Sequence, residues 1–167
     1  MTTLKIYKTF SSIELPKFAT EQSACFDLSF QNVGKFDYSG FNRMNKAFTR
    51  PFKDGRLFVN AGDRIMVPTG LIFDIPKGYS VRVHARSGLS LKQGLVLVNS
   101  EGVIDSDYIE ETFVLLMNVS DNGHWINNTG ADISTVYGFT YIITNRLNGR
   151  RYIGCKQVKT KKRSNWR

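Results

Sequence analysis

Residues 57–85 read LFVNAGDRIMVPTGLIFDIPKGYSVRVHA, and this stretch decides the fold class. Its apolar runs are short and rich in β-branched residues, and turn residues separate them, as in Asn-Ala-Gly-Asp at 60–63 and Pro-Lys-Gly at 76–78. Apolar and polar residues alternate with a period of two at 79–84, which is typical of a half-buried strand. The stretch therefore predicts several consecutive short strands.

The same pattern continues on the C-terminal side, with apolar runs at 94–98 and 112–120. No part of residues 1–128 carries a convincing apolar stripe with helical spacing. Residues 30–56 break the rhythm, because they are polar and aromatic with scattered glycines, and they read as a long loop or insertion. Many short strands at regular spacing predict an all-β domain over residues 1–128, a jelly roll or β-barrel.

The composition excludes several classes of protein. The chain has 167 residues, of which 41% are hydrophobic and 22% charged, as expected of a globular protein of ordinary domain size. It contains no run of 18 apolar residues that could span a membrane, and its N-terminus lacks the apolar core of a signal peptide. Cys25 and Cys155 are then expected to be reduced thiols, and the expected location is the cytoplasm.

The net charge of +9 is unevenly distributed. Of the 23 basic residues nine lie within residues 138–167, which contain no acidic residue, so the other 14 balance the 14 acidic residues of the chain. The chain thus consists of a neutral body, residues 1–137, and a basic tail, and the expected division into domains is 1–128 and a basic C-terminal segment, 129–167. A basic segment of this kind is compatible with binding to nucleic acid.

Residues 99–111, NSEGVIDSDYIEE, concentrate polar groups between two predicted strands. A hairpin there would expose backbone donors and acceptors that can bond the edge of a flat polar ring. Asp105 could orient or deprotonate a water molecule, and the ring of Tyr108 could pack against a sugar. In the alternative interpretation Asp105 and Asp107 are solvated turn residues and Tyr108 is a core aromatic residue.

Two further stretches carry polar groups beside predicted strands. HARSGLSLKQG, residues 84–94, brings together Arg86, Ser87 and Gly88, which suit phosphate oxygens. The alternative is an ordinary strand-to-helix connection with Ser87 as the helix cap. SACFDLSF, residues 23–30, sets Asp27 between apolar residues, where it could equally be a buried, hydrogen-bonded carboxylate.

Taken together, the three stretches resemble three motifs of the trimeric dUTPase family, in the order and spacing of that family. The resemblance covers residues 1–128 and implies a homotrimer whose sites each use three subunits. The matching residues are Ala24-Cys25-Phe26-Asp27-Leu28, then Arg86-Ser87-Gly88-Leu89, then Asn99 with Gly102, Ile104, Asp105 and Tyr108.

The resemblance implies a role for each matching residue of the third motif. Uracil is recognised by Asn99 and by the backbone near Gly102 and Ile104. Asp105 activates the attacking water. Tyr108 stacks on the deoxyribose and leaves no room for a 2′-hydroxyl group.

The first two motifs imply the phosphate side of the site. Arg86, Ser87 and Gly88 would hold phosphates, and Asp27 would place the Mg²⁺-bound triphosphate through water. The reaction implied is hydrolysis of dUTP to dUMP and pyrophosphate, with Mg²⁺ neutralising the triphosphate and water attacking the α-phosphorus.

The chain also departs from the family. Cys25 replaces a usual glycine, and Ile109-Glu110 follows the tyrosine where a glycine is usual. The fourth motif should follow residues 124–128, HWINN, but TGADISTVYGFT stands there and its glutamine is missing. The glycine-rich fifth motif is missing as well. Gly-Asp-Arg-Ile at 62–65 has the letters of the fourth motif but precedes the second, and it reads as strand and turn. These departures predict reduced turnover.

Residues 137–157, YGFTYIITNRLNGRRYIGCKQ, read as two strands around an Asn-Gly turn. One interpretation is a basic β-hairpin that completes the barrel. In the other, this stretch resembles the beginning of a GIY-YIG nuclease, with Tyr141 ending the first element and Tyr152-Ile153-Gly154 as the second. Arg163 or Arg167 would then match the catalytic arginine of that family.

Three functions remain open on the sequence alone. The first is an active dUTP hydrolase, and the second is a nucleotide-binding trimer with little turnover. The third is a chimera that binds or nicks nucleic acid, in which a dUTPase reading frame of phage type is interrupted near Asn128 by a partial homing nuclease. A phage protein of this kind would act in the host cytoplasm.

Overall fold

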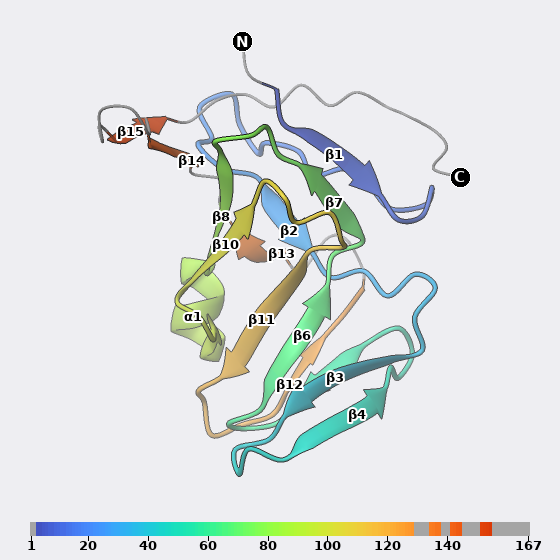
Figure 1. Cartoon of the computed structure of the whole chain (residues 1–167). Coiled ribbons are helices and arrows are strands. Elements are labelled where there is room, and N and C mark those ends of the chain that lie inside the picture. Colours follow the sequence, from blue (N-terminus) through green and yellow to red (C-terminus); the bar gives the residue numbers. More distant parts are fainter. Residues whose placement is uncertain (1–2, 129–133, 138–140, 145–150, 155–167) are drawn as a thin grey trace.

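The computed structural model of the chain describes residues 3–128, 134–137, 141–144 and 151–154. Antiparallel strands dominate it, with one short helix, α1 (Ser87–Gln93) (Figure 1). The largest sheet has five strands, in the order β4 (Ala47–Pro51), β3 (Asp37–Phe41), β6 (Arg64–Pro68), β11 (Phe113–Asn118) and β9 (Leu95–Leu97). The expected all-β jelly-roll or barrel architecture is confirmed.

A four-stranded sheet packs against the first one. Its order is β10 (Glu101–Asp105), β8 (Ser80–His84), β13 (Ser134–Tyr137) and β2 (Asp27–Ser29). Three antiparallel pairs complete the described strands, β1 (Lys5–Lys8) with β7 (Leu71–Asp74), β5 (Leu57–Val59) with β12 (His124–Ile126), and β14 (Tyr141–Thr144) with β15 (Arg151–Gly154).

The period-two pattern of the sequence becomes the two faces of these sheets. In β11, Val114 and Leu116 are buried, whereas Leu115 between them is exposed. Its antiparallel partner β6 buries Ile65 and Val67 in the same layer. Alternation over these strands forms one apolar core, and burying the core side chains provides the main driving force for folding.

Residues 30–56, expected to be a loop or insertion, contain the hairpin of β3 and β4, which extends the large sheet. Its tip is a polar turn, in which the side chain of Asn42 accepts hydrogen bonds from the backbone N–H groups of Met44 and Lys46. Asn45 adopts the left-handed backbone conformation with φ of 59°, which asparagine tolerates better than most residues. The polar turn residues therefore led to the expectation of a loop where the structure has a hairpin.

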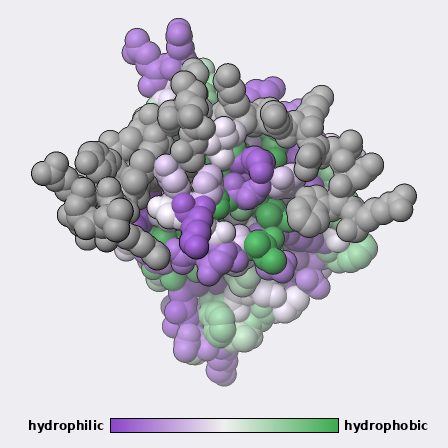
Figure 2. Space-filling view, turned by 45° about the horizontal axis from the view of Figure 1, so that its top comes forward, coloured by the Kyte–Doolittle hydropathy of each residue, from purple (hydrophilic) through white to green (hydrophobic). Residues whose placement is uncertain are grey.

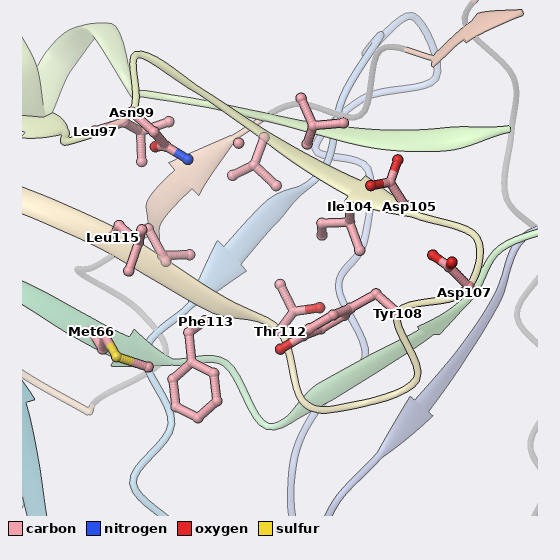
Figure 3. Close-up of a pocket in the computed structure, with 14 residues that line it drawn as sticks. Met66, Leu97, Asn99, Ile104, Asp105, Asp107, Tyr108, Thr112, Phe113 and Leu115 are labelled. Atoms are coloured by element: carbon pink, nitrogen blue, oxygen red, sulfur yellow. The ribbon is translucent and has the colours of Figure 1, made fainter.

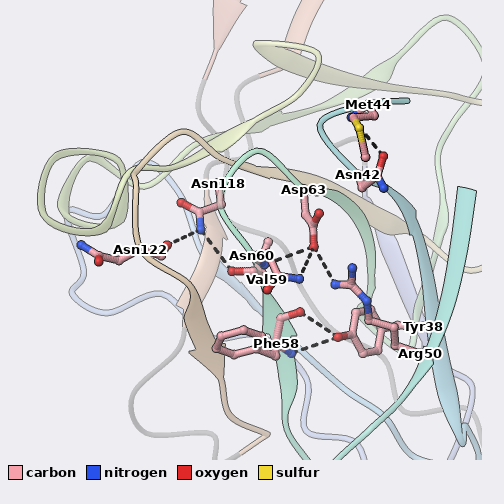
Figure 4. Close-up of polar contacts among 10 residues, drawn as sticks. All are labelled: Tyr38, Asn42, Met44, Arg50, Phe58, Val59, Asn60, Asp63, Asn118 and Asn122. Carbon is pink, nitrogen blue, oxygen red and sulfur yellow. Dashed lines mark hydrogen bonds and ion pairs between the residues drawn. The ribbon is translucent and has the colours of Figure 1, made fainter. Parts of the chain in front are cut away.

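A buried carboxylate joins this hairpin to the barrel (Figure 4). Asp63 is only 2% exposed, and its Oδ2 accepts hydrogen bonds from Nη1 of Arg50 at 2.6 Å and from Nδ2 of Asn60 at 2.9 Å. Burial opposes the charge on Arg50, but the hydrogen bond to Asp63 and the charge of Asp63 raise the pKa of the guanidinium. The Gly-Asp-Arg-Ile letters at 62–65 are therefore structural, as the sequence indicated.

The polar stretch 99–111 is more than a hairpin tip. Residues 101–105 form β10. The strands before and after it, β9 and β11, lie in the five-stranded sheet, whereas β10 pairs with β8 in the four-stranded sheet, with Ile104 opposite Val81. Both side chains are buried, which accounts for the isoleucine of the Val-Ile step, whereas Val103 is exposed. The stretch thus bridges the two sheets.

The C-terminal strands divide between two partners. The expected hairpin is present, with β14 paired to β15, but its described ladder involves no barrel strand. The strand before it, β13, lies in the four-stranded sheet instead. The interpretation of 137–157 as a hairpin that completes the barrel stays a prediction, since β14 lies close to β8 but the strand that pairs with β8 and β2 is β13. The Asn-Gly turn at 148–149 lies outside the described residues.

The surface is a mixture of polar and apolar side chains. On the face seen in Figure 2, small hydrophobic groups are separated by hydrophilic ones. The described part of the chain has no helix of the length and apolar character needed to cross a bilayer.

Candidate active site

A cavity of about 450 Å³ lies beside the polar stretch 99–111. Five residues that the sequence singled out line it, namely Asn99, Gly102, Ile104, Asp105 and Tyr108. Figure 3 shows the amide of Asn99 at one end of the cavity, the carboxylates of Asp105 and Asp107 at the other, and the ring of Tyr108 beside Thr112. The structure therefore brings together all the candidate residues of this stretch.

The backbone of β10 contributes to this cavity. Among the described strands β10 lies at the edge of its sheet, so that the N–H and C=O groups on its outer side have no ladder partner. Such groups can bond the donors and acceptors of a planar ring. Gly102 is tightly packed, because a Cβ atom there would lie 3.2 Å from Cβ of Val83. A glycine at this position thus keeps the strand close to β8.

An ion pair fixes β10 against β8. Glu101 stands opposite His84, and its Oε2 accepts a hydrogen bond of 2.5 Å from Nη1 of Arg82. Its Oε1 lies 3.4 Å from Nε2 of His84. Glu101 is flanked by Asn99 and Gly102, both of which line the cavity, so its contacts hold the cavity wall in place.

The far end of the loop is anchored through Glu111. Its Oε1 accepts a hydrogen bond of 2.8 Å from the backbone N–H of Gly70, and its Oε2 lies 2.7 Å from Nζ of Lys35. The hydroxyl of Tyr108 donates to the carbonyl of Glu111 at 2.8 Å. Gly70 lies in the β6–β7 turn, so this turn fixes the position of Glu111. Because the Tyr108 hydroxyl bonds to Glu111, contacts outside the loop help to orient the Tyr108 ring.

The phenol of Tyr108 is kept in its neutral form. Burial, followed by the negative charges of Glu110 and Glu111, raises its pKa above the ordinary value of 10.0. The group therefore remains a hydrogen-bond donor throughout the neutral range. Tyr108 as a whole is 41% exposed and lines the cavity, so a ligand can reach it.

A second cavity, of about 510 Å³, contains one candidate residue from each of the first two motifs. Asp27, at the start of β2, and Arg86, directly before α1, both line it. Lys17 and Gln31 add further polar groups. The cavity is predominantly polar and carries the guanidinium and ammonium groups that bind phosphate oxygens.

Ser87 and Gly88 are exposed in the first turn of α1 and line neither cavity. No side-chain hydrogen bond caps this helix, and the capping position is occupied by Arg86. The alternative role of Ser87 as a helix cap is therefore wrong. A Cβ atom on Gly88 would meet no atom within 4 Å, so its backbone is open to a ligand.

The two cavities have no lining residue in common. The β6–β7 turn separates them, because Thr69 and Leu71 line the second cavity while Thr112, which is bonded to both, lines the first. Within one chain, the candidate residues of the third motif therefore lie in a different cavity from Asp27 and Arg86.

The described residues contain no group of three or more His, Cys, Asp or Glu side chains able to hold a metal ion. Asp27 and Glu14 are the carboxylates that line the polar cavity, together with Arg86 and Lys17. This arrangement, two carboxylates beside cationic groups, does not fit a resident metal in an all-protein cage. It fits Mg²⁺ that arrives with a triphosphate, because that ion keeps several waters and takes few protein ligands.

The candidate nuclease residues lie on the C-terminal hairpin. Tyr141 begins β14 and is the backbone partner of Gly154 in β15, and Tyr152 is the partner of Ile143. Arg163 and Arg167 lie outside the described residues. The hairpin register thus brings the two GIY-YIG elements side by side.

The sequence did not reveal several residues that shape the first cavity. Met66, Phe113 and Leu115 line it from the outer face of the large sheet. Thr112 lines it too, and its Oγ1 is buried without a hydrogen-bond partner among the described residues. The exposed apolar positions of β6 and β11 were a usable signal, since alternation alone would assign polar residues there.

Comparison with known proteins identifies the barrel. A family model described as dUTPase matches residues 54–133. This part of the chain is similar to the dUTPase family. A second model, described as the GIY-YIG domain of the putative endonuclease segE, matches residues 124–167. The chain therefore joins a dUTPase-like barrel to a GIY-YIG-like segment, and the two matches overlap over ten residues, 124–133.

Individual relatives agree with the family match. The deoxyuridine 5′-triphosphate nucleotidohydrolase of Brucella melitensis is 47% identical over 70 residues, which are 42% of this chain and 45% of that protein. The enzyme of the same name from Chlamydia felis is 36% identical over 112 residues, 67% of this chain and 62% of that one. The chain thus spans about half the length of the first dUTPase relatives.

A solved dUTPase has the same fold. The structure of the dUTPase of Staphylococcus bacteriophage 80alpha superimposes with a TM-score of 0.60 and 14% sequence identity, over 98% of this chain and 99% of that one. At this level of identity the likeness concerns the fold alone.

Proposed function

We propose that the protein hydrolyses dUTP to dUMP and pyrophosphate with Mg²⁺ bound to the substrate. One observation carries the proposal, namely that Asn99, Gly102, Ile104, Asp105 and Tyr108 line a single cavity in a chain similar to the dUTPase family. The relatives named above are nucleotidohydrolases of this substrate.

The chemistry assigned to the first cavity follows from its groups. The amide of Asn99 and the outer backbone of β10 bond the edge of uracil, whose carbonyl and N–H groups match them. The ring of Tyr108 packs against deoxyribose and excludes a 2′-hydroxyl group. Asp105, at the end of β10, accepts a proton from the water that attacks the α-phosphorus.

The second cavity is assigned to the triphosphate. Arg86 pairs with phosphate oxygens, and the open backbone at Ser87 and Gly88 offers further donors. Asp27 orients the hydrated cation that accompanies the substrate, and that cation neutralises the phosphate charge.

A homotrimer accounts for the separation of the two cavities. Because they share no lining residue on one chain, a complete site would combine the first cavity of one copy with the second cavity of another. This is the arrangement that the resemblance to trimeric dUTPases implies. The boundary near residue 128 and a cytoplasmic location, that of the host for a phage protein, are part of the same proposal.

Turnover is expected to be lower than in dUTPases that retain a fourth motif. The family's glutamine is replaced by the residues that follow HWINN, so one set of contacts to the substrate is lost. Substrate binding, which depends on the first three motifs, is retained.

The test is pyrophosphate release from dUTP with Mg²⁺, beside dCTP, dTTP and UTP. Release from dUTP alone is the expected result. Equal release from UTP would contradict the role given to Tyr108, and equal release from dCTP would contradict uracil recognition by Asn99. No release from a protein that still binds dUTP would leave a nucleotide-binding trimer and refute the hydrolase.

A second candidate function is nucleic-acid binding by the C-terminal segment. Two observations favour it, the nine basic residues without an acidic one in 138–167 and the GIY-YIG match. Such binding should weaken steeply as salt rises from about 50 to 200 mM, because phosphate contacts release counterions. A duplex affinity that does not change with salt would exclude it.

A further inference from the structure

Strand β13 occupies an internal position in the four-stranded sheet. It lies between β8 and β2, and the backbone of Tyr137 is partnered with Asp27 on one side and with His84 on the other. Among the described strands β2 has no other ladder partner. The attachment of β2 to this sheet therefore depends on residues 134–137.

The two strands that β13 joins carry the candidate phosphate-binding residues. Asp27 is the first residue of β2, and Arg86 follows the end of β8 by two residues. Both line the polar cavity. One intervening strand sets the distance between β2 and β8 at two strand spacings, roughly 10 Å.

The sequence of β13 does not come from the part matched to dUTPases. That match ends at residue 133, and residues 134–137 lie entirely within the GIY-YIG match, 124–167. The ladder between β13 and β2 is irregular, with a register shift between Ser134 and Val136. Such a bulge absorbs one extra residue, which lets a strand fit a position whose spacing it does not match.

We infer that the GIY-YIG-like segment is an integral part of the dUTPase barrel, in which strand 134–137 holds Asp27 in register with Arg86. The segment thereby fills a gap in the sheet that the end of the dUTPase sequence would leave. The inference rests on the proposed function only for the role of these two residues, and the sheet pairing itself does not depend on it.

Loss of β13 would expose groups that the barrel buries. Phe26, Leu28 and Phe30 surround β2 and are at most 5% exposed, and Val81 and Val83 of β8 are also buried. The backbone groups of both neighbouring strands would lose their partners, which is costly in a buried sheet. β14, by contrast, pairs only with β15 among the described strands, although it lies close to β8. β13, which pairs with strands of the barrel, should therefore matter more to the barrel than β14 does.

A pair of proline substitutions in the full-length chain tests the inference. Proline removes a backbone donor and is poorly tolerated in a strand with neighbours on both sides. Val136→Pro in β13 should lower Tm by at least about 8 °C and kcat/KM for dUTP by about tenfold or more. Ile142→Pro in β14, a strand that lies close to β8 without pairing with it, is the matched control and should lower both quantities much less, and Val136→Ala should resemble the parent.

Hydrogen exchange of the parent chain gives a second measurement that needs no variant. Amides of 134–137 should exchange as slowly as those of 27–29 and 80–84. Exchange of 134–137 at the rate of an unstructured chain, or a Val136→Pro variant with unchanged Tm, would overturn the inference. An inactive parent with protected 134–137 amides would instead refute the proposed function and leave the role of β13 standing.

Discussion

The hydroxyl of Thr69 donates a hydrogen bond of 2.7 Å to the main-chain carbonyl of Thr112, in a contact that is buried on both sides. It ties the β6–β7 turn to the start of β11 and so forms part of the wall between the two cavities. The hydroxyl of Thr112 itself is buried and has no partner among the described residues. Of these two neighbouring threonines, Thr69 therefore has a hydrogen-bonded hydroxyl group and Thr112 has one without a partner among the described residues.

This difference predicts opposite effects of the same substitution. Thr69→Val removes the donor to the Thr112 carbonyl and should lower the free energy of unfolding by about 1 to 2 kcal/mol. Thr112→Val removes a buried group without a partner and should leave the free energy unchanged or raise it by up to about 1 kcal/mol. Urea unfolding of the two variants checks both values. Equal destabilisation by both would show that the Thr112 hydroxyl has a partner.

Asp105 and Asp107 line the same cavity, but only Asp105 lies on β10 and matches the family's catalytic position. Asp105→Asn keeps the shape and removes the base, so turnover of dUTP should fall by about 10² or more while the affinity for dUTP changes little. Asp107→Asn is the matched control, with an expected loss of less than threefold. Turnover assays and equilibrium titration measure the two quantities. A greater loss in the control would move the catalytic role to Asp107.

The raised pKa of Tyr108 leads to a prediction for alkaline pH. Since the pKa in the folded state exceeds the ordinary 10.0, the neutral phenol contributes stability that is fully present below pH 10 and is lost as pH rises through the folded pKa. Thermal unfolding of the parent and of Tyr108→Phe from pH 7 to 11 checks this. The difference in Tm should be constant up to pH 9 and should shrink above pH 10. A difference that grows with pH would contradict the sign.

The ion pair of Glu101 with Arg82 should support substrate binding through the position of β10. Glu101→Gln weakens that pair beside Asn99, so KM for dUTP should rise about threefold to tenfold while kcat changes less than twofold. Glu110→Gln, at an exposed position of the same loop, serves as the control. Steady-state kinetics separates the two parameters. A fall in kcat at constant KM would contradict a positioning role.

The sequence predicted the architecture because alternation is a local property. Turn chemistry around 57–85, the short apolar runs of β6 and β11 and the alternation in β8 were enough to indicate an antiparallel sandwich or barrel. The hairpin of β3 and β4 was missed because its exposed face carries Ser39, Thr49 and other polar residues, so that neither strand has the apolar composition of a typical strand. Its stability comes from pairing with β6, which a local pattern does not reveal.

Part of the candidate site could be predicted, again because sequence patterns report local relationships. Residues close in sequence, such as Asn99, Asp105 and Tyr108, were found together in one cavity. Contacts across the chain could not be read from spacing, and Glu111 is the clearest example, since Gly70 and Lys35, which hold it, are 41 and 76 residues away. The separation of Arg86 from Asp105 into different cavities is likewise a property of the three-dimensional arrangement.

The separation of the two cavities has a consequence for mixed assemblies. If complete sites combine cavities from neighbouring copies, Asp105→Asn and Arg86→Ala damage different halves of the same site. Co-refolding equal amounts of these two inactive proteins should then restore roughly a quarter of the parental turnover, because that share of sites draws an intact half from each partner. A site contained in one chain would give no recovery at all. Two mutant genes in one cell could thus complement each other, although each alone encodes a dead enzyme.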